Sequence, residues 1–137
     1  IGNPLENTVA IASIVFGGLL DECPELKLCF AHGGGYACFG MPRMDRGFKV
    51  RSEARENITS LPSEYLSKIY YDCLTHGPEE LEYLVNRVGF DRVLLGSDFP
   101  FDMGLDSPPE WISQMPFLND SSKEAILGGN AKGLLKI

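Results

Sequence analysis

Basic residues are scarce in this 137-residue sequence. Twelve Lys and Arg stand against 19 Asp and Glu, which gives a net charge of -7 at pH 7. A negative surplus repels phosphate backbones and anionic lipid surfaces, because both attract proteins through Lys and Arg. The composition therefore argues against nucleic acid and against a membrane surface as partners.

A long apolar run is also lacking. The most apolar stretch, residues 9–20, includes Ser13, Gly17 and Gly18, and it is far shorter than the roughly 20 apolar residues of a membrane-spanning helix. We therefore expect no membrane segment. A phosphate-binding loop is excluded too, because the triple glycine at residues 33–35 is not part of a G-x-x-x-x-G-K-[ST] pattern.

Paired cysteine spacings are absent as well. The four cysteines are Cys23, Cys29, Cys38 and Cys73, and no two of them are spaced as C-x-x-C. The absence of this spacing argues against a zinc-ribbon metal site. The immediate neighbours of Cys29 and Cys38 are apolar, so reduced, buried thiols in a cytoplasmic protein are expected in preference to a disulfide framework.

Strand-like and helix-like segments alternate along the chain. Asn3, Pro4 and Glu6 precede an apolar run and predict a helix from residue 4 to residue 20 or 22, capped by Asn3. Short apolar runs predict strands at residues 26–31, 68–74 and 92–98. Further helices are expected to begin at Pro78, after Ser107, near Ser121 and after Asn130. Residues 51–63 are interpreted as a polar connecting segment before the second strand, and no helix or strand is predicted for residues 35–48.

This alternation predicts an α/β fold with a parallel sheet and helical crossovers. Three strands cannot close a barrel of eight, and a sequence that opens on a helix is typical of a piece cut between a strand and its helix. A piece of a barrel is therefore favoured over an open sheet. Because no linker or low-complexity run interrupts the sequence, residues 1–137 are interpreted as a single, partial domain.

Polar residues end all three predicted strands. His32 follows the first strand, Thr75 and His76 follow the second, and Ser97 and Asp98 end the third. In parallel α/β folds ligands bind at the carboxyl ends of the strands, because the loops converge there. A histidine and an aspartate that meet there can share a divalent metal and its water, with the imidazole as proton carrier.

Several short segments, in this order and spacing, resemble those of one family. They are Phe30-Ala31-His32-Gly33-Gly34-Gly35, Tyr71-Asp72, Leu94-Leu95-Gly96-Ser97-Asp98-Phe99-Pro100 and Gly129-Asn130-Ala131, together with the opening Glu6-Asn7-Thr8 and Ile14-Val15-Phe16-Gly17-Gly18. Over essentially its whole length the sequence resembles the C-terminal half of the amidohydrolase-related family that includes aminocarboxymuconate semialdehyde decarboxylase.

The resemblance implies the C-terminal part of a (β/α)8 TIM barrel and a metal-dependent decarboxylase or hydrolase of a small, carboxylate-bearing substrate. It implies that His32 is the catalytic histidine, which activates or orients water at the metal and assists proton transfer. It implies that Asp98 is a catalytic carboxylate and a metal ligand. Arg43 matches an arginine that reaches a neighbouring subunit's active site in a dimer, where a guanidinium pairs with the substrate carboxylate in a bidentate manner.

The metal site implied by the resemblance, most simply a zinc site, is incomplete in this sequence. Family members take two ligands from an H-x-H pair on the first barrel strand and another histidine from the fifth, whereas this sequence has two histidines in all. Because catalytic zinc is usually held by three protein ligands, Asp98 with His32 is not expected to hold it alone. Unpaired sheet edges and uncovered apolar surface predict self-association or association with the missing N-terminal half.

Each candidate residue also has a purely structural interpretation. His32 is then a strand-terminal histidine satisfied by the glycine-loop amides, Asp98 a turn residue before Phe99, and His76 a helix cap. Arg43 is then part of a solvated basic face. On this interpretation the chain is a catalytically inactive half-barrel that serves assembly only.

Overall fold

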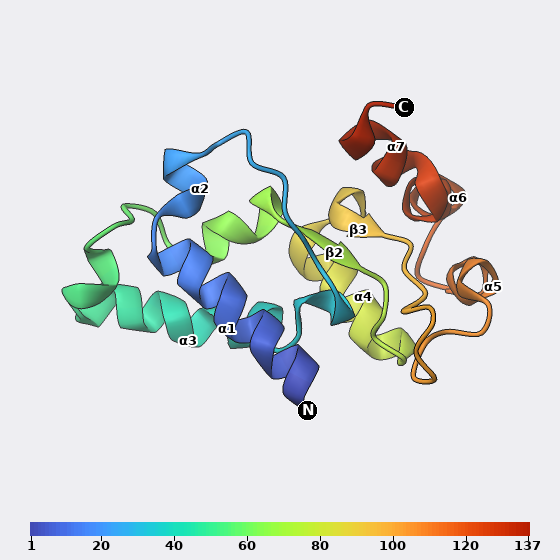
Figure 1. Ribbon diagram of the computed structural model, residues 1–137, viewed down its shortest axis with the longest axis horizontal. Coiled ribbons are helices and arrows are strands. Elements are labelled where there is room, and N and C mark those ends of the chain that lie inside the picture. The colour runs from blue at the N-terminus through green and yellow to red at the C-terminus, as the bar shows by residue number, and fades with distance from the viewer.

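A small parallel sheet lies at the centre of the chain, as a computed structural model of all 137 residues shows (Figure 1). The strands β1 (Cys29–Phe30), β2 (Tyr70–Asp72) and β3 (Val93–Leu94) lie in the order β1-β2-β3. Both strand pairs are parallel. The predicted α/β fold with helical crossovers is therefore confirmed, although each strand is shorter than its apolar run. β1 and β3 each keep one unpaired edge.

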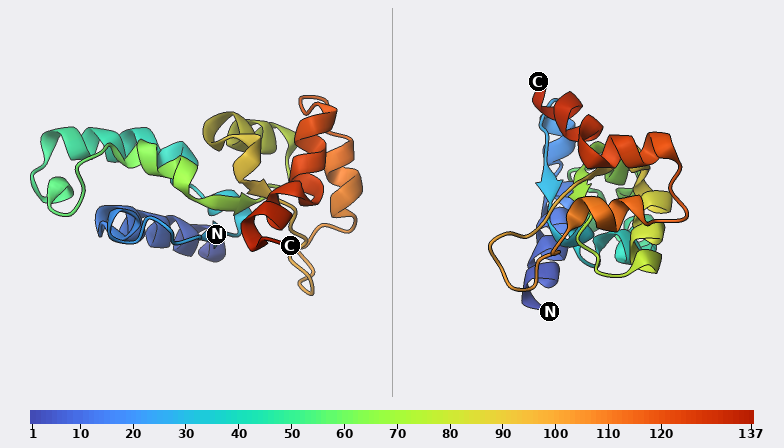
Figure 2. Two further views of the ribbon diagram at one scale, coloured as in Figure 1. Left: turned by 90° about the horizontal axis from the view of Figure 1, so that it is seen from above. Right: turned by 90° about the vertical axis from the view of Figure 1, so that its right-hand side faces the viewer.

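Helices surround this sheet and extend the molecule at both ends. Figure 2 shows α1, α2 and α3 at one end of the long axis and α5, α6 and α7 at the other. The α-helices are α1 (Gly2–Phe16), α2 (Leu19–Glu22), α3 (Ala37–Val50), α4 (Pro78–Val88), α5 (Pro108–Ser113), α6 (Asp120–Glu124) and α7 (Asn130–Leu135). Short 3-10 turns are η1 (His32–Gly34), η2 (Glu53–Arg55), η3 (Pro62–Lys68) and η4 (Phe90–Arg92), and η5 (Ala125–Gly129) is a π-helical turn. No helix is long and apolar enough to cross a bilayer.

The first helix is shorter than predicted. It begins at Gly2 with Ile1 at the cap position, so the prediction of Asn3 as its cap is wrong. It ends at Phe16, and α2 starts after Gly18, whose backbone is left-handed with φ 76°. A side chain at Gly18 would collide with the carbonyl oxygen of Asn57. The break therefore occurs where the chain needs a glycine for both conformation and space.

Helix α3 was not predicted, because Gly40, Pro42 and Gly47 obscure its pattern. Glycine and proline are the weakest helix formers. The helix nevertheless buries Ala37, Cys38 and Met41 and packs against α1 and η3. Its stability therefore comes from tertiary packing of one apolar face more than from local propensity.

The remaining helix predictions are partly right. α4 starts at Pro78 and buries Leu81, Leu84 and Val88, as its spacing predicts. α6 is capped by Asn119, whose side chain accepts a hydrogen bond from Ser122 N at 2.9 Å, so the cap predicted near Ser121 is wrong.

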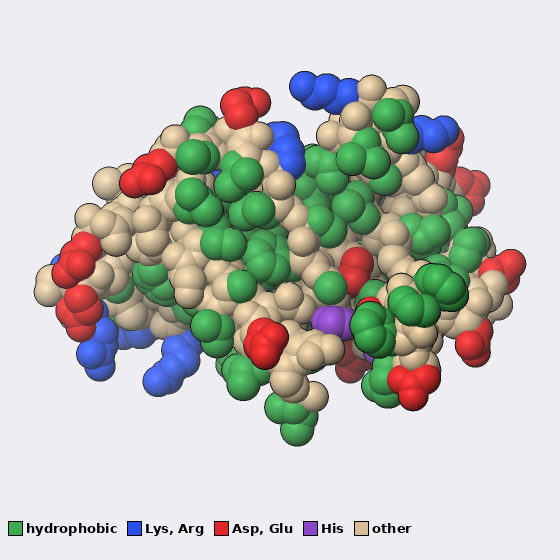
Figure 3. All heavy atoms as spheres, viewed as in Figure 1, with side chains coloured by type: hydrophobic (Ala, Val, Ile, Leu, Met, Phe, Trp, Pro, Cys, Tyr) green, Lys and Arg blue, Asp and Glu red, His purple; other side chains and the backbone are tan.

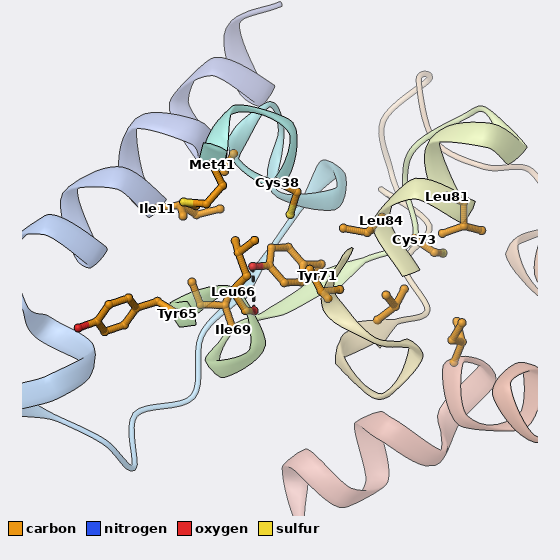
Figure 4. Close-up of a cluster of buried hydrophobic side chains, with 14 of the residues drawn as sticks. Ile11, Cys38, Met41, Tyr65, Leu66, Ile69, Tyr71, Cys73, Leu81 and Leu84 are labelled. Carbon is orange, nitrogen blue, oxygen red and sulfur yellow. Dashed lines mark hydrogen bonds between the residues drawn. The ribbon is translucent and has the colours of Figure 1, made fainter. Parts of the chain in front are cut away.

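Tyr71 on β2 lies at the centre of the hydrophobic core (Figure 4). Its ring is fully buried, its hydroxyl donates to the carbonyl of Leu66 at 3.1 Å, and its ring leaves no room for a side chain at Gly34. Side chains from α1, α3, η3 and α4 surround it, together with Ile69, which follows η3. Those labelled in Figure 4 include Ile11, Met41, Leu66 and Leu84. The core thus holds the loop after β1 against β2.

All four cysteines are free thiols. Cys38 and Cys73 are buried, as expected, but Cys23 and Cys29 are exposed, and for these two the expectation of burial is wrong. Cys29 lies on β1, an edge strand that pairs with β2 on one side only. Large apolar side chains are exposed too, and Figure 3 shows hydrophobic groups across one face of the molecule.

Candidate active site

His32 and Asp98 face each other at the carboxyl end of the sheet. His32 Nε2 lies 3.7 Å from Asp98 Oδ2, and each side chain is about one fifth exposed. The two residues follow β1 and β3, the strands on either side of β2. The structure therefore brings together the two residues that the sequence singles out, with both polar groups accessible to a small molecule.

Each strand is followed by a residue with an unusual backbone. His32, His76 and Asp98 have φ angles of 57°, 60° and 60°. This left-handed region is uncommon for residues with a side chain, and such conformations cluster at functional sites. The three residues turn the chain at the mouth of the sheet, where their side chains line one cavity.

That cavity has a volume of about 300 Å³. Its walls are formed by Ile1, Gly2, Asn3, Pro4, His32, His76, Asp98 and Met103. The first turn of α1 thus closes one side of the space between the strand ends. Figure 3 shows histidine side chains at this surface, next to acidic and hydrophobic groups. His76 does not cap α4, because Gly77 is at the cap position.

Asn7 on α1 contacts the imidazole of His32. Asn7 Nδ2 donates to the carbonyl oxygen of Ala31 at 2.9 Å and lies 3.1 Å from His32 Nδ1. The sequence prediction did not assign a role to Asn7. A contact between residues 25 positions apart has no signal in local spacing, and only the place of Asn7 in the opening Glu6-Asn7-Thr8 segment distinguished it.

Asp72 at the end of β2 anchors the backbone that carries His32. Its Oδ1 atom accepts hydrogen bonds from Gly33 N at 2.9 Å and Leu74 N at 3.1 Å. Burial raises the pKa of Asp72, and the hydrogen bonds from the two backbone N–H groups oppose that rise. Asp72 therefore affects the site by fixing the backbone, because its carboxylate binds the main chain after β1 and the main chain after β2.

The loop that carries Asp98 is held by its own turn. Phe99 N donates to Ser97 Oγ at 3.2 Å, and Phe101 N donates to the Asp98 carbonyl at 2.8 Å. Ser97 and the main chain of Asp98 thus make the turn, while the Asp98 carboxylate faces His32.

Arg43 is not part of this cavity within one chain. It is exposed on α3 and lines a separate surface hollow with Arg46 and Arg51. The predicted contact with a neighbouring subunit's active site stays a prediction.

The donor groups present fit part of a metal site. No cluster of three or more His, Cys, Asp or Glu side chains that could hold a metal ion occurs in residues 1–137. The partly exposed Asp98 carboxylate fits as one hard oxygen ligand. A complete ligand set would require donors beyond these residues, as the two-histidine composition predicts.

Comparisons with known proteins point to one family. The chain is 40% identical over 132 residues to 2-amino-3-carboxymuconate-6-semialdehyde decarboxylase from Dictyostelium discoideum, covering 96% of this chain and 37% of that protein. It is 33% identical to the protein of the same name from Caenorhabditis elegans, covering all of this chain and 34% of that protein. The chain thus spans little more than a third of the length of these relatives.

A solved structure shows the same fold. The 5-carboxyvanillate decarboxylase from Novosphingobium aromaticivorans, which contains bound manganese, superposes with a TM-score of 0.87 at 18% identity, covering all of this chain and 41% of that one. The three parallel strands and their helices are the fold of part of a (β/α)8 TIM barrel, as expected. The Amidohydrolase family model matches residues 1–137. With this match, two relatives above 30% identity and a polar site at the strand ends, the chain belongs to the Amidohydrolase family.

Proposed function

We propose that the protein containing this chain is a metal-dependent, non-oxidative decarboxylase of a small, carboxylate-bearing substrate. The observation that carries the proposal is the opposition of His32 Nε2 and Asp98 Oδ2 across one cavity, at 3.7 Å. The names of the two curated relatives favour decarboxylation over hydrolysis and suggest 2-amino-3-carboxymuconate-6-semialdehyde as the first substrate to test.

Non-oxidative decarboxylation needs a proton at a defined place. The bond between carbon and carboxylate breaks, carbon dioxide leaves, and the electron pair left on carbon takes a proton. The imidazole of His32 is suited to carry that proton near neutral pH. Its Nε2 atom faces the cavity, so a substrate carbon bound between the strand ends lies on the correct side of the ring.

Asp98 has two tasks in this proposal. Its carboxylate is an acceptor that faces His32 Nε2 at 3.7 Å, and it supplies one oxygen ligand for a divalent cation. A divalent cation held by Asp98 and by donors outside these residues would act as a Lewis acid toward developing negative charge. Zinc follows from the family resemblance, and manganese is an alternative because the Novosphingobium enzyme contains it.

Arg43 is proposed to act across a subunit interface. It lies outside the His32 cavity of its own chain, and its guanidinium is exposed on α3. A homodimer that places Arg43 beside a neighbour's cavity would provide a bidentate partner for a substrate carboxylate. On this basis we propose a dimer as the active form.

The test uses the full-length protein and measures carbon dioxide release and metal content together. Asn tolerates a left-handed backbone better than most residues, so His32→Asn and Asp98→Asn are suitable variants. We expect His32→Asn to keep its metal and lose turnover by at least about a hundredfold. We expect Asp98→Asn to lose both. Asp91→Asn, which removes an exposed carboxylate beside Arg92, is the control and should change neither.

Full activity in both site variants would contradict the proposal. Absence of metal and of turnover in the full-length protein would instead favour an inactive barrel that serves assembly.

A further inference from the structure

The orientation of the Asn7 side-chain amide can be deduced from its partners. One atom of this amide lies 2.9 Å from Ala31 O and 3.1 Å from His32 Nδ1. A backbone carbonyl oxygen only accepts hydrogen bonds, so the amide atom beside it must be the nitrogen. The oxygen cannot occupy that position without facing another oxygen. The carbonyl of Ala31 therefore fixes which way the amide points.

The same nitrogen then determines the tautomer of His32. An NH2 group carries two hydrogens and offers no acceptor, so its second hydrogen points at His32 Nδ1. In a neutral imidazole one ring nitrogen accepts and the other carries the hydrogen. Nδ1 is the acceptor here, and the hydrogen is on Nε2, the atom that faces Asp98 Oδ2.

We infer that Asn7 is a positioning residue that holds neutral His32 in the Nε2–H form with its ring turned toward Asp98. The consequence for catalysis rests on the proposed function, because it assumes that His32 moves the proton. The assignment of the tautomer does not rest on it. Residues that orient metal ligands in a comparable way typically cost 10- to 100-fold in metal affinity or activity when removed, and we expect an effect of this order for the partner of His32.

Helix α1 is seated firmly enough for this role. Next to Asn7, Thr8 is buried; its hydroxyl accepts a hydrogen bond from Tyr36 N at 2.8 Å and donates to Pro4 O at 2.7 Å. Gly35 has no side chain, and any side chain there would collide with the Pro4 carbonyl. Asn7 and Thr8 thus bind the two ends of the loop from Ala31 to Tyr36, so the loop and the helix form one unit.

The experiment is a long-range proton–nitrogen NMR spectrum of the full-length protein with 15N-labelled histidine, at a pH where His32 is neutral. The His32 signals are assigned by their loss in His32→Asn. We expect a hydrogen-bearing Nε2 and a bare Nδ1 in the unmodified protein. In Asn7→Asp the side chain can only accept hydrogen bonds, so we expect Nδ1 to gain the hydrogen and kcat to fall at least about tenfold with little change in KM.

Asn57→Asp is the matched control. Asn57 Nδ2 donates to Phe16 O at 3.2 Å, at the other end of α1, so this variant removes a similar bond and adds the same charge far from His32. It should leave the spectrum and kcat unchanged. A hydrogen on Nδ1 in the unmodified protein, or an unchanged His32 pattern in Asn7→Asp, overturns the inference. Full activity of His32→Asn would reject the proposed function while the tautomer assignment stands.

Discussion

Gly33 donates its backbone N–H to Asp72 Oδ1 at 2.9 Å, which ties the loop after β1 to the end of β2. Because the same oxygen accepts Leu74 N, one carboxylate holds the main chain next to His32 and the main chain of its own strand end. The geometry of the candidate site thus depends on a side chain that does not line the cavity.

Replacing Asp72 by Ala should destabilise the protein. Two buried N–H groups would lose their acceptor, and each such loss costs about 1 to 3 kcal/mol. We therefore expect the free energy of unfolding to decrease by about 2 to 6 kcal/mol. Asp72→Asn keeps an oxygen at the same place and should cost much less. Urea denaturation of both variants of the full-length protein measures this. Equal stability of Asp72→Ala and the unmodified protein contradicts the proposed anchor.

The pH dependence of stability should carry opposite contributions from Asp72 and Asp21. The pKa of Asp72 is raised by burial, so its contribution to stability is complete below the ordinary carboxyl pKa of about 3.9 and is lost as the pH rises through the raised value. The pKa of Asp21 is lowered by the hydrogen bond from Tyr65 and by Lys68, so its contribution is present above about pH 3.9 and is lost as the pH falls.

Melting temperatures of Asp72→Asn and Asp21→Asn between acid and neutral pH separate these contributions. As the pH rises, the melting temperature of Asp72→Asn should increase relative to that of the unmodified protein. Asp21→Asn should melt at a lower temperature than the unmodified protein at neutral pH, and this difference in melting temperature should shrink as the pH falls. Parallel curves for all three proteins would show that neither carboxyl pKa changes on folding.

Subunit mixing tests whether Arg43 acts on a neighbour. Arg43→Ala and His32→Asn should each be inactive alone. If Arg43 reaches across the interface, a mixed dimer with one subunit of each variant contains one site in which both His32 and Arg43 are intact. Random exchange at equal amounts should therefore restore about a quarter of the activity of the unmodified protein. No recovery on mixing, with exchange verified by mass spectrometry, rejects the role across the interface.

Thiol labelling tests the core around Cys38. Burial raises the pKa of the Cys38 thiol to about 11, and the side chain is almost fully buried. Since the thiolate is the reactive form, iodoacetamide at about pH 8 should leave Cys38 unmodified while exposed Cys23 reacts. Mass spectrometry of digested protein measures both. Rapid labelling of Cys38 without unfolding contradicts the packing of α3 against the core.

The sequence predicts the site better than it predicts the elements that support it. His32 and Asp98 were predicted to meet because the carboxyl ends of parallel strands lie at the same end of a sheet, and this rule needs only that the strands be parallel. Asn7 and Asp72 act through contacts 25 and 39 positions away, and no spacing rule reports such contacts. Helix α3 was missed because Pro42 and two glycines lower its local propensity, whereas its packing against α1 and η3 is a property of the folded chain.

The left-handed backbone at His32, His76 and Asp98 limits how this site can change, whether by evolution or by design. Glycine and asparagine occupy that conformation at low cost, and β-branched residues do not. A His32→Gly variant keeps the loop geometry and leaves a vacancy the size of an imidazole. Imidazole added to the solution is then expected to enter this vacancy and restore part of the lost turnover. No such rescue is expected for His32→Val, because a β-branched residue does not adopt the left-handed backbone at low cost.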